Sequence, residues 1–233
     1  NEITTALAKL RSIAPKRRWY VTKRLDGSSG KNVAIVDRNV EYLVGMLQDE
    51  IYYGGNHMIL EERITPPPLS SLVEKLNRSL SSRSIDYNFR VITTLDPKNP
   101  RVIDAEIRFR KQDEIPVPVN ITYEDDPADA IRLDNFKNEE LKQRIYKIAE
   151  TAVKAICQSA RYSHGKNFGL AGVDVMIDND GAIYVIEVNT GGVGGFGTLA
   201  RIDNKPPSSL TNILIPTWLP RLESNFEKRA INP

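Results

Sequence analysis

Oxygen-bearing side chains gather near the end of one segment, "GLAGVDVMIDNDGAIYVIEVN", which runs from Gly169 to Asn189. Side chains alternate along a strand, so Glu187 and Asn189 are expected on one face. The turn residues Asp178–Gly181 predict a hairpin. This hairpin places Asp174 opposite the Glu187–Asn189 end, so three oxygen donors converge in a patch otherwise lined by Val, Ile and Met.

Two carboxylates and an amide are costly to bury together unless something positive neutralises them. Mg²⁺ meets this need, because it prefers a few carboxylate oxygens together with phosphate oxygens. Two such ions would bridge the phosphates of ATP and polarise its γ-phosphoryl group. The alternative is an ordinary hairpin with exposed acids at its edges, which is the interpretation adopted for the turn residues Asp178 and Asp180.

An earlier hairpin supplies a second group of candidates. Trp19–Lys23 and Val33–Val36 are predicted strands, and the turn between them, Asp26–Gly30, contains small and flexible residues. Small residues let backbone N–H groups approach a phosphate closely, and Lys23 lies just before this turn. The alternative for Lys23 is a solubilising lysine at a strand edge.

The rest of the chain mixes strands and helices. Further strands are predicted over residues 58–64, 88–93, 101–110 and 115–121, and helices over 4–13, 40–50, 141–160 and 210–229. The helix 141–160 carries an apolar stripe of Ile145, Ile148, Ala149, Ala152 and Ile156. Pro66–Pro68 cannot continue a strand ladder and indicate a hinge between two lobes. The hairpins favour an α+β fold with antiparallel sheets over a doubly wound parallel sheet.

Composition excludes several other classes. The 233 residues include 32 basic and 30 acidic side chains, a balance that does not favour a nucleic-acid binder. The chain has no run of eighteen apolar residues, so no membrane span is expected. Its single cysteine, Cys157, excludes an internal disulfide framework and fits the cytoplasm. No Gly-x-Gly-x-x-Gly unit and no Walker A sequence occur, and the glycine-rich stretch 191–197 lacks the Lys-Ser/Thr ending.

The late hairpin, "GVDVMIDNDGAIYVIEVNTGG", resembles the metal-binding end of the ATP-grasp superfamily. It looks most like the tubulin–tyrosine-ligase, ribosomal-protein glutamate-ligase and peptide-ligase branches. The resemblance implies that Asp174, Glu187 and Asn189 are the Mg²⁺ ligands.

Two further matches occur in the expected order. "WYVTKRLDGSSGKNVAIV" is similar to the strand that carries the family's phosphate lysine, followed by its glycine loop. This match implies that Lys23 contacts the α- and β-phosphates. The residues that would close over the phosphates are Ser28, Ser29 and Gly30.

"HMILEERI" is similar to the family's adenine strand. By this match Glu61 would meet the exocyclic amine, and the backbone around Glu62, with Ile64, would clamp the base. The alternative is that both glutamates are simply exposed before a turn. Arg90 and Arg108 resemble the arginines that touch the γ-phosphate and the acyl phosphate. Arg110 shares the strand face of Arg108 and could serve instead, and surface salt bridges are the alternative role for each.

The resemblance implies an ATP-grasp fold of two lobes with antiparallel sheets that clasp ATP. Residues 15–65 would form the small lobe with the glycine-rich loop, and residues 66–233 the large lobe with the metal site and a C-terminal helix. The family's N-terminal substrate domain has no counterpart, and its first ATP lysine has no assigned match, so we expect a partner chain or a further domain.

The implied activity is an ATP-dependent carboxylate–amine ligase for peptides or amino acids. A carboxylate would attack the γ-phosphate of MgATP, and an amine would then attack the acyl phosphate to give an amide, ADP and phosphate. The alternatives are a small-molecule kinase with an ATP-grasp fold and a nucleotide-binding module without turnover.

Overall fold

A computed structural model describes residues 5, 8–9, 12, 19–24, 34–37, 58–73, 85–111, 129–133, 136–159 and 169–190. Several predicted features lie outside these residues: the turn with Ser28, Ser29 and Gly30, the strand 115–121, the helices 40–50 and 210–229, and the glycine-rich stretch 191–197. The four described residues between 5 and 12 are helical, as predicted for the start of the chain.

Contacts divide the chain into two compact units. The first comprises Asn1–Leu69, Leu76–Tyr87 and Phe109–Asp129, and the second comprises Ser70–Lys75, Asn88–Arg108 and Ala130–Pro233. The assignment of 15–65 and 66–233 to two lobes stays a prediction.

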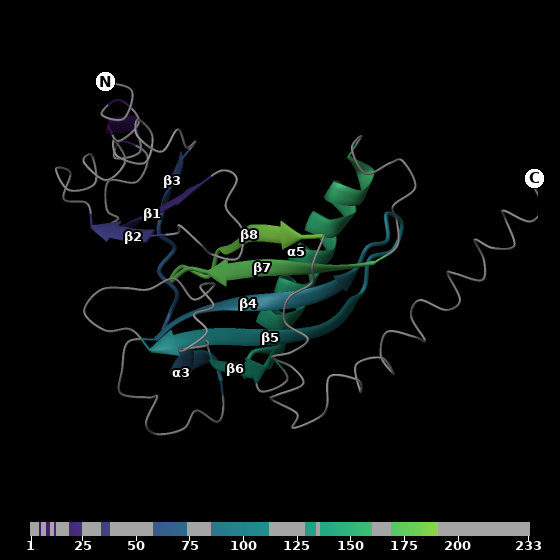
Figure 1. The fold of residues 1–233 in the computed structure, drawn as a ribbon. Coiled ribbons are helices and arrows are strands. Elements are labelled where there is room, and N and C mark those ends of the chain that lie inside the picture. Colours follow the sequence, from purple (N-terminus) through teal and green to yellow (C-terminus); the bar gives the residue numbers. More distant parts are fainter. Residues whose placement is uncertain are drawn as a thin grey trace, which may run out of the picture. The chain divides into compact units, whose positions relative to one another are not determined.

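The first unit contains a three-stranded antiparallel sheet (Figure 1). Strand β1 (Trp19–Arg24) lies between β2 (Ala34–Asp37) and β3 (Met58–Glu62). All three strands were predicted, and β3 ends two residues before the predicted end. Tyr20 and Thr22 of β1 point to a buried face, whereas Lys23 alternates to the other face.

The segment after β3 leaves the sheet, as its prolines predict. Residues 63–68 form no helix or strand before the short helix α3 (Leu69–Leu72) begins. Arg63 Nη2 lies 2.7 Å from Asp86 Oδ2, and the hydroxyl of Tyr87 donates to the carbonyl of Pro67 at 2.8 Å. These contacts attach the segment to the start of the next strand.

Most of a five-stranded sheet lies in the second unit. Its strand order is β6-β5-β4-β7-β8, and β7 is antiparallel to both β4 and β8. The bounds are β4 (Ile85–Thr94), β5 (Val102–Lys111), β6 (Asp129–Arg132), β7 (Leu170–Ile177) and β8 (Ile183–Asn189). Sequence patterns predicted all of them except β6, whose four residues are too few to show an alternating pattern.

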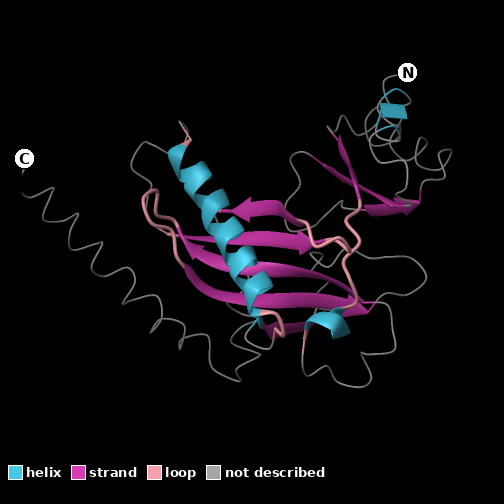
Figure 2. Ribbon diagram, turned by 180° about the vertical axis from the view of Figure 1, so that it is seen from behind, coloured by secondary structure: helices cyan, strands magenta, loops and turns pink. Residues whose placement is uncertain are grey.

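Helix α5 (Glu139–Gln158) packs on β7 and β8 and lies across one face of this sheet (Figures 1 and 2). Asn138 caps its first turn, because the side-chain oxygen accepts from the Leu141 N–H at 2.9 Å. Neither described helix, α3 or α5, is both long and apolar enough to cross a membrane.

The predicted apolar stripe of α5 is partly wrong. The buried row consists of Ile145, Ala149, Val153 and Cys157. Ile148, Ala152 and Ile156 of the predicted stripe are only half-buried. The reason is that one row of residues spaced four apart faces the sheet, and the neighbouring row lies at its flank.

The turn between β7 and β8 confirms that Asp178 is a structural turn residue, but the expectation that its carboxylate is exposed is wrong, because the side chain is buried. Its Oδ1 accepts from the backbone N–H groups of Asp180 and Ala182, each at 2.9 Å. Its Oδ2 accepts from the Tyr184 hydroxyl at 2.9 Å. Gly181 has a φ of 80°, a left-handed conformation that favours glycine.

Candidate functional site

The three predicted metal ligands lie together at the open end of the β7–β8 hairpin. Asp174 is the register partner of Glu187, and Gly172 is the register partner of Asn189. Alternation places these side chains on the face opposite to Val173 and Val188. A bulge follows immediately, because the register shifts between Asp174 and Val175. Bulges of this kind often lie beside functional sites, where they redirect side chains.

Arg90 of β4 joins this group and connects its members. Its Nε lies 2.8 Å from Asp174 Oδ1, in a register-paired position on the neighbouring strand. With the Asn189 amide oriented to satisfy its neighbours, its oxygen accepts from Arg90 Nη1 at 3.1 Å and its nitrogen donates to Glu187 Oε1 at 2.9 Å. The four side chains thus form one polar cluster across β4, β7 and β8.

The expectation of apolar surroundings for the three oxygen donors is wrong. Besides Arg90, the charged face of the sheet carries Glu106 and Arg108 on β5, which pair at 2.5 Å. Both residues act electrostatically on Asp174. The positive charge that the buried carboxylates require therefore comes, in this structure, from the chain's own arginines.

Gly172 makes room for Arg90 on the sheet. A Cβ atom at this position would lie 2.4 Å from Arg90 Nη1 and 3.2 Å from its Cδ. Any side chain at residue 172 would therefore push the guanidinium out of its position. The glycine directly precedes the Val-Asp pair of β7, so its place in the sequence is a signal of close approach.

Burial dominates the electrostatics of the cluster. It raises the pKa of the fully buried Asp174 carboxyl to about 6, although Arg90 and Arg108 oppose the change. Burial also lowers the pKa of the Arg90 guanidinium, against the effect of Asp174, and raises the pKa of Glu106. Burial therefore disfavours the ionised forms of Asp174, Arg90 and Glu106. Perturbed pKa values of this kind are common at functional sites.

The donor set at the hairpin end is compatible with Mg²⁺. Both oxygens of Asp174 are buried and lack a regular hydrogen bond within the described residues, although Arg90 lies within ion-pair distance of one of them. Glu187 is exposed and Asn189 half-buried at the same end of the hairpin. Two carboxylates and one amide fit the oxygen preference of Mg²⁺. In the described part of the chain, His, Cys, Asp and Glu side chains alone form no group of three that could hold a metal ion. The donor set at the hairpin end has two carboxylates and depends on the Asn189 amide for its third donor.

Two of the predicted nucleotide-binding residues of the first unit, Lys23 and Glu61, form an ion pair. Lys23 Nζ lies 2.7 Å from Glu61 Oε2, diagonally across β1 and β3. Glu62 is opposite Tyr20, so its side chain lies on the other face of this sheet. Ile64 follows the end of β3 and is half-buried. The roles assigned to these residues stay predictions.

Sequence reasoning missed Glu106. Its side chain is fully buried, and one carboxylate oxygen lacks a hydrogen-bond partner among the described residues. The signal lies in the segment "AEIRFR", where Glu106 and Arg108 are two residues apart and therefore share a strand face.

Comparison with protein-family models finds no match, and comparison with curated protein sequences also finds none. Solved structures do resemble the chain. The D-alanine–D-alanine ligase from Coxiella burnetii matches with a TM-score of 0.53 and 13% identity, over 97% of this chain and 52% of that chain.

Two further solved structures match less well. D-cycloserine synthetase DcsG has a TM-score of 0.48 and 17% identity, over 91% of this chain and 56% of that one. The L-amino acid ligase from Bacillus licheniformis has a TM-score of 0.44 and 20% identity, over 76% of this chain and 33% of that one. The chain therefore spans between a third and somewhat more than half of the length of these proteins.

The likeness to D-alanine–D-alanine ligase and the antiparallel sheets of the chain show its fold. The fold is α+β and of the ATP-grasp kind, as the resemblance predicted.

Proposed function

We propose that this chain is the nucleotide-binding part of an ATP-dependent carboxylate–amine ligase. The observation that carries the proposal is the cluster of Asp174, Glu187 and Asn189, three predicted metal ligands, with Arg90. Arg90 pairs with Asp174 and donates to Asn189, and Asn189 donates to Glu187. The ATP-grasp fold supports the proposal.

Each residue has a specific part in the proposed reaction. Asp174, Glu187 and Asn189 would hold Mg²⁺, which when bound shields the phosphate charges and polarises the γ-phosphoryl group. Arg108 would stabilise the charge that develops on the transferred phosphoryl group, because a guanidinium offers donors in a planar fork. Arg90 is fixed by Asp174 and Asn189 and would orient these two side chains.

The nucleotide would be bound by the residues that the resemblance assigns to it. Lys23 would pair with the α- and β-phosphates, and Ser28, Ser29 and Gly30 would supply backbone N–H groups to them. Glu61, Glu62 and Ile64 would contact the base. The substrate carboxylate would attack the γ-phosphate, and an amine would then displace phosphate from the acyl phosphate, with ADP as the other product.

The test is a product analysis with a site variant. The protein is incubated with ATP, Mg²⁺ and a panel of amino acids and dipeptides, beginning with D-alanine, the amino acid for which the D-alanine–D-alanine ligase is named. We expect ADP release that depends on both substrates and an amide product. Glu187→Gln should reduce ADP release by about 100-fold or more while thermal unfolding is unchanged, because Glu187 is exposed at the strand end.

The matched control is Asp180→Asn, which removes one exposed carboxylate from the same hairpin. It should leave ADP release unchanged. A phosphate ester instead of an amide would assign the site to a kinase, and nucleotide binding without ADP release would assign it to a binding module. Full activity of Glu187→Gln would refute the metal assignment.

A further inference from the structure

The Glu106–Arg108 pair on β5 is unusual because one member is completely buried and only half satisfied. Glu106 Oε1 accepts from Arg108 Nε at 2.5 Å. Glu106 Oε2 is buried and has no hydrogen-bond partner among residues that the structure describes. A buried carboxylate with an unpaired oxygen costs free energy, so stability alone does not account for a glutamate at this position.

The contact leaves the outer part of the Arg108 side chain available. Glu106 engages Nε, and neither Nη atom of Arg108 has a hydrogen-bond or ion-pair partner within the described ranges. The side chain is 14% exposed. Because a guanidinium is planar, fixing its Nε edge also fixes the direction of its Nη donors. Residues two apart on a strand share a face, so Glu106 can hold Arg108 without help from another strand or helix.

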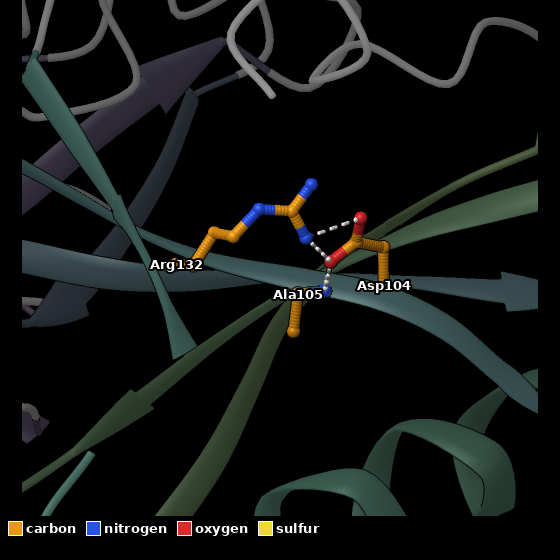
Figure 3. A network of polar contacts seen from close by, with 3 residues as sticks. All are labelled: Asp104, Ala105 and Arg132. Carbon is orange, nitrogen blue, oxygen red and sulfur yellow. Dashed lines mark hydrogen bonds and ion pairs between the residues drawn. The ribbon is translucent and has the colours of Figure 1, made fainter. Parts of the chain in front are cut away.

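The two neighbouring arginines have different partners. Arg90 Nε lies at ion-pair distance from Asp174, and Arg90 Nη1 donates to the Asn189 oxygen, so one Nη group of Arg90 is already engaged. Arg132 donates through Nη1 to both oxygens of Asp104 at 3.0 Å, and Asp104 Oδ1 also accepts from the Ala105 N–H at 2.8 Å (Figure 3). Asp104 thus engages an Nη group of Arg132, whereas Glu106 engages the Nε of Arg108 and leaves both Nη groups of Arg108 available within the described part of the chain.

We propose that Glu106 is a positioning residue that holds Arg108 by its Nε so that both Nη groups face an oxyanion of the transferred phosphoryl group. This inference rests on the proposed function. It predicts that Glu106 touches neither nucleotide nor substrate and acts through the orientation of Arg108. Donors that are oriented before the reaction stabilise developing charge without a cost of reorganisation.

The first measurement is steady-state kinetics of Glu106→Gln. Glutamine can still accept from Arg108 but carries no charge, and its free amide can rotate, so Arg108 is held less firmly. We expect kcat to fall by about 10- to 100-fold while KM for ATP changes by less than about twofold. In an Arg108→Ala background the same substitution should have no further effect, because the two residues act as a unit.

Asp104→Asn is the matched control, because it weakens an ion pair on the same strand. It should lower the melting temperature and leave kcat within about twofold of the wild-type value. Glu106→Gln should not lower the melting temperature, because burial raises the pKa of Glu106 against the effect of Arg108, and the substitution removes this poorly solvated charge. Equal losses of kcat in both variants, or additive losses in Glu106→Gln and Arg108→Ala, would overturn the proposal.

A second measurement does not depend on turnover. The Arg108 Nε–H signal in ¹⁵N NMR should be slow to exchange in the wild type, faster in Glu106→Gln, and shifted by the non-hydrolysable analogue AMP-PNP with Mg²⁺. If the wild type releases no ADP, the proposed function fails, yet this measurement still decides the positioning role. An Arg108 signal that is unaffected by Glu106→Gln overturns it.

Discussion

Asp174→Asn should make the protein more stable at neutral pH. Burial raises the pKa of Asp174 from the ordinary value of 3.8 to about 6. One tenfold change in proton affinity corresponds to about 1.4 kcal/mol, so ionising this buried carboxyl costs about 3 kcal/mol of folding free energy at pH 7. Asparagine has the shape of the neutral acid and avoids this cost, and Arg90 keeps an acceptor in the side-chain oxygen.

The pH dependence has a definite sign. Because the folded-state pKa of Asp174 is raised, the folded protein binds more protons than the unfolded chain between about pH 4 and pH 6. The stability that this proton provides is complete below pH 4 and is lost as the pH rises through about 6. The difference in unfolding free energy between Asp174→Asn and wild type should therefore grow from near zero at pH 4 to about 3 kcal/mol at pH 7.

The assay is denaturant unfolding of both proteins at several pH values between 4 and 8, in EDTA so that no divalent cation contributes. Asp180→Asn serves as the control, because it removes an exposed charge from the same hairpin. If Asp174→Asn is less stable than wild type at pH 7, then attraction between Arg90 and Asp174 outweighs burial, and the reasoning is refuted.

Two further predictions concern the neighbours of the cluster and the first unit. Gly172→Ala should lower the unfolding free energy by about 1–3 kcal/mol, because its Cβ would lie 2.4 Å from Arg90 Nη1; an unchanged denaturation midpoint would contradict this. Lys23→Ala should weaken ATP binding by about tenfold in isothermal titration, since one charge-assisted contact is lost, whereas an unchanged affinity would remove Lys23 from the phosphate site.

The sequence predicted the parts of the fold that depend on local patterns. The alternation in β7 and β8 and the turn chemistry at Asp178 and Gly181 determined the hairpin, its register and therefore the meeting of Asp174 with Glu187. Helix α5 was predicted within two residues at each end, because its apolar spacing is regular.

Contacts between distant segments were not predictable in the same way. No local pattern states that β4 lies beside β7, so the pairing of Arg90 with Asp174 could not be anticipated. The same holds for the buried row of α5, because the direction in which the helix crosses the sheet selects Val153 and Cys157 over their neighbours. Strand β6 was missed because it is short and is defined by its pairing.

The cluster also changes the argument from which the metal site was first inferred. Buried carboxylates do require a positive partner, but Arg90 and Arg108 already supply one, so burial of acids alone does not identify a cation site. What still points to a cation is the combination of unsatisfied Asp174 oxygens with the exposed Glu187 beside them. If the arginines were sufficient, Mg²⁺ would leave the wild-type unfolding midpoint unchanged; a cation bound by these oxygens would raise it, and Asp174→Asn would abolish that increase.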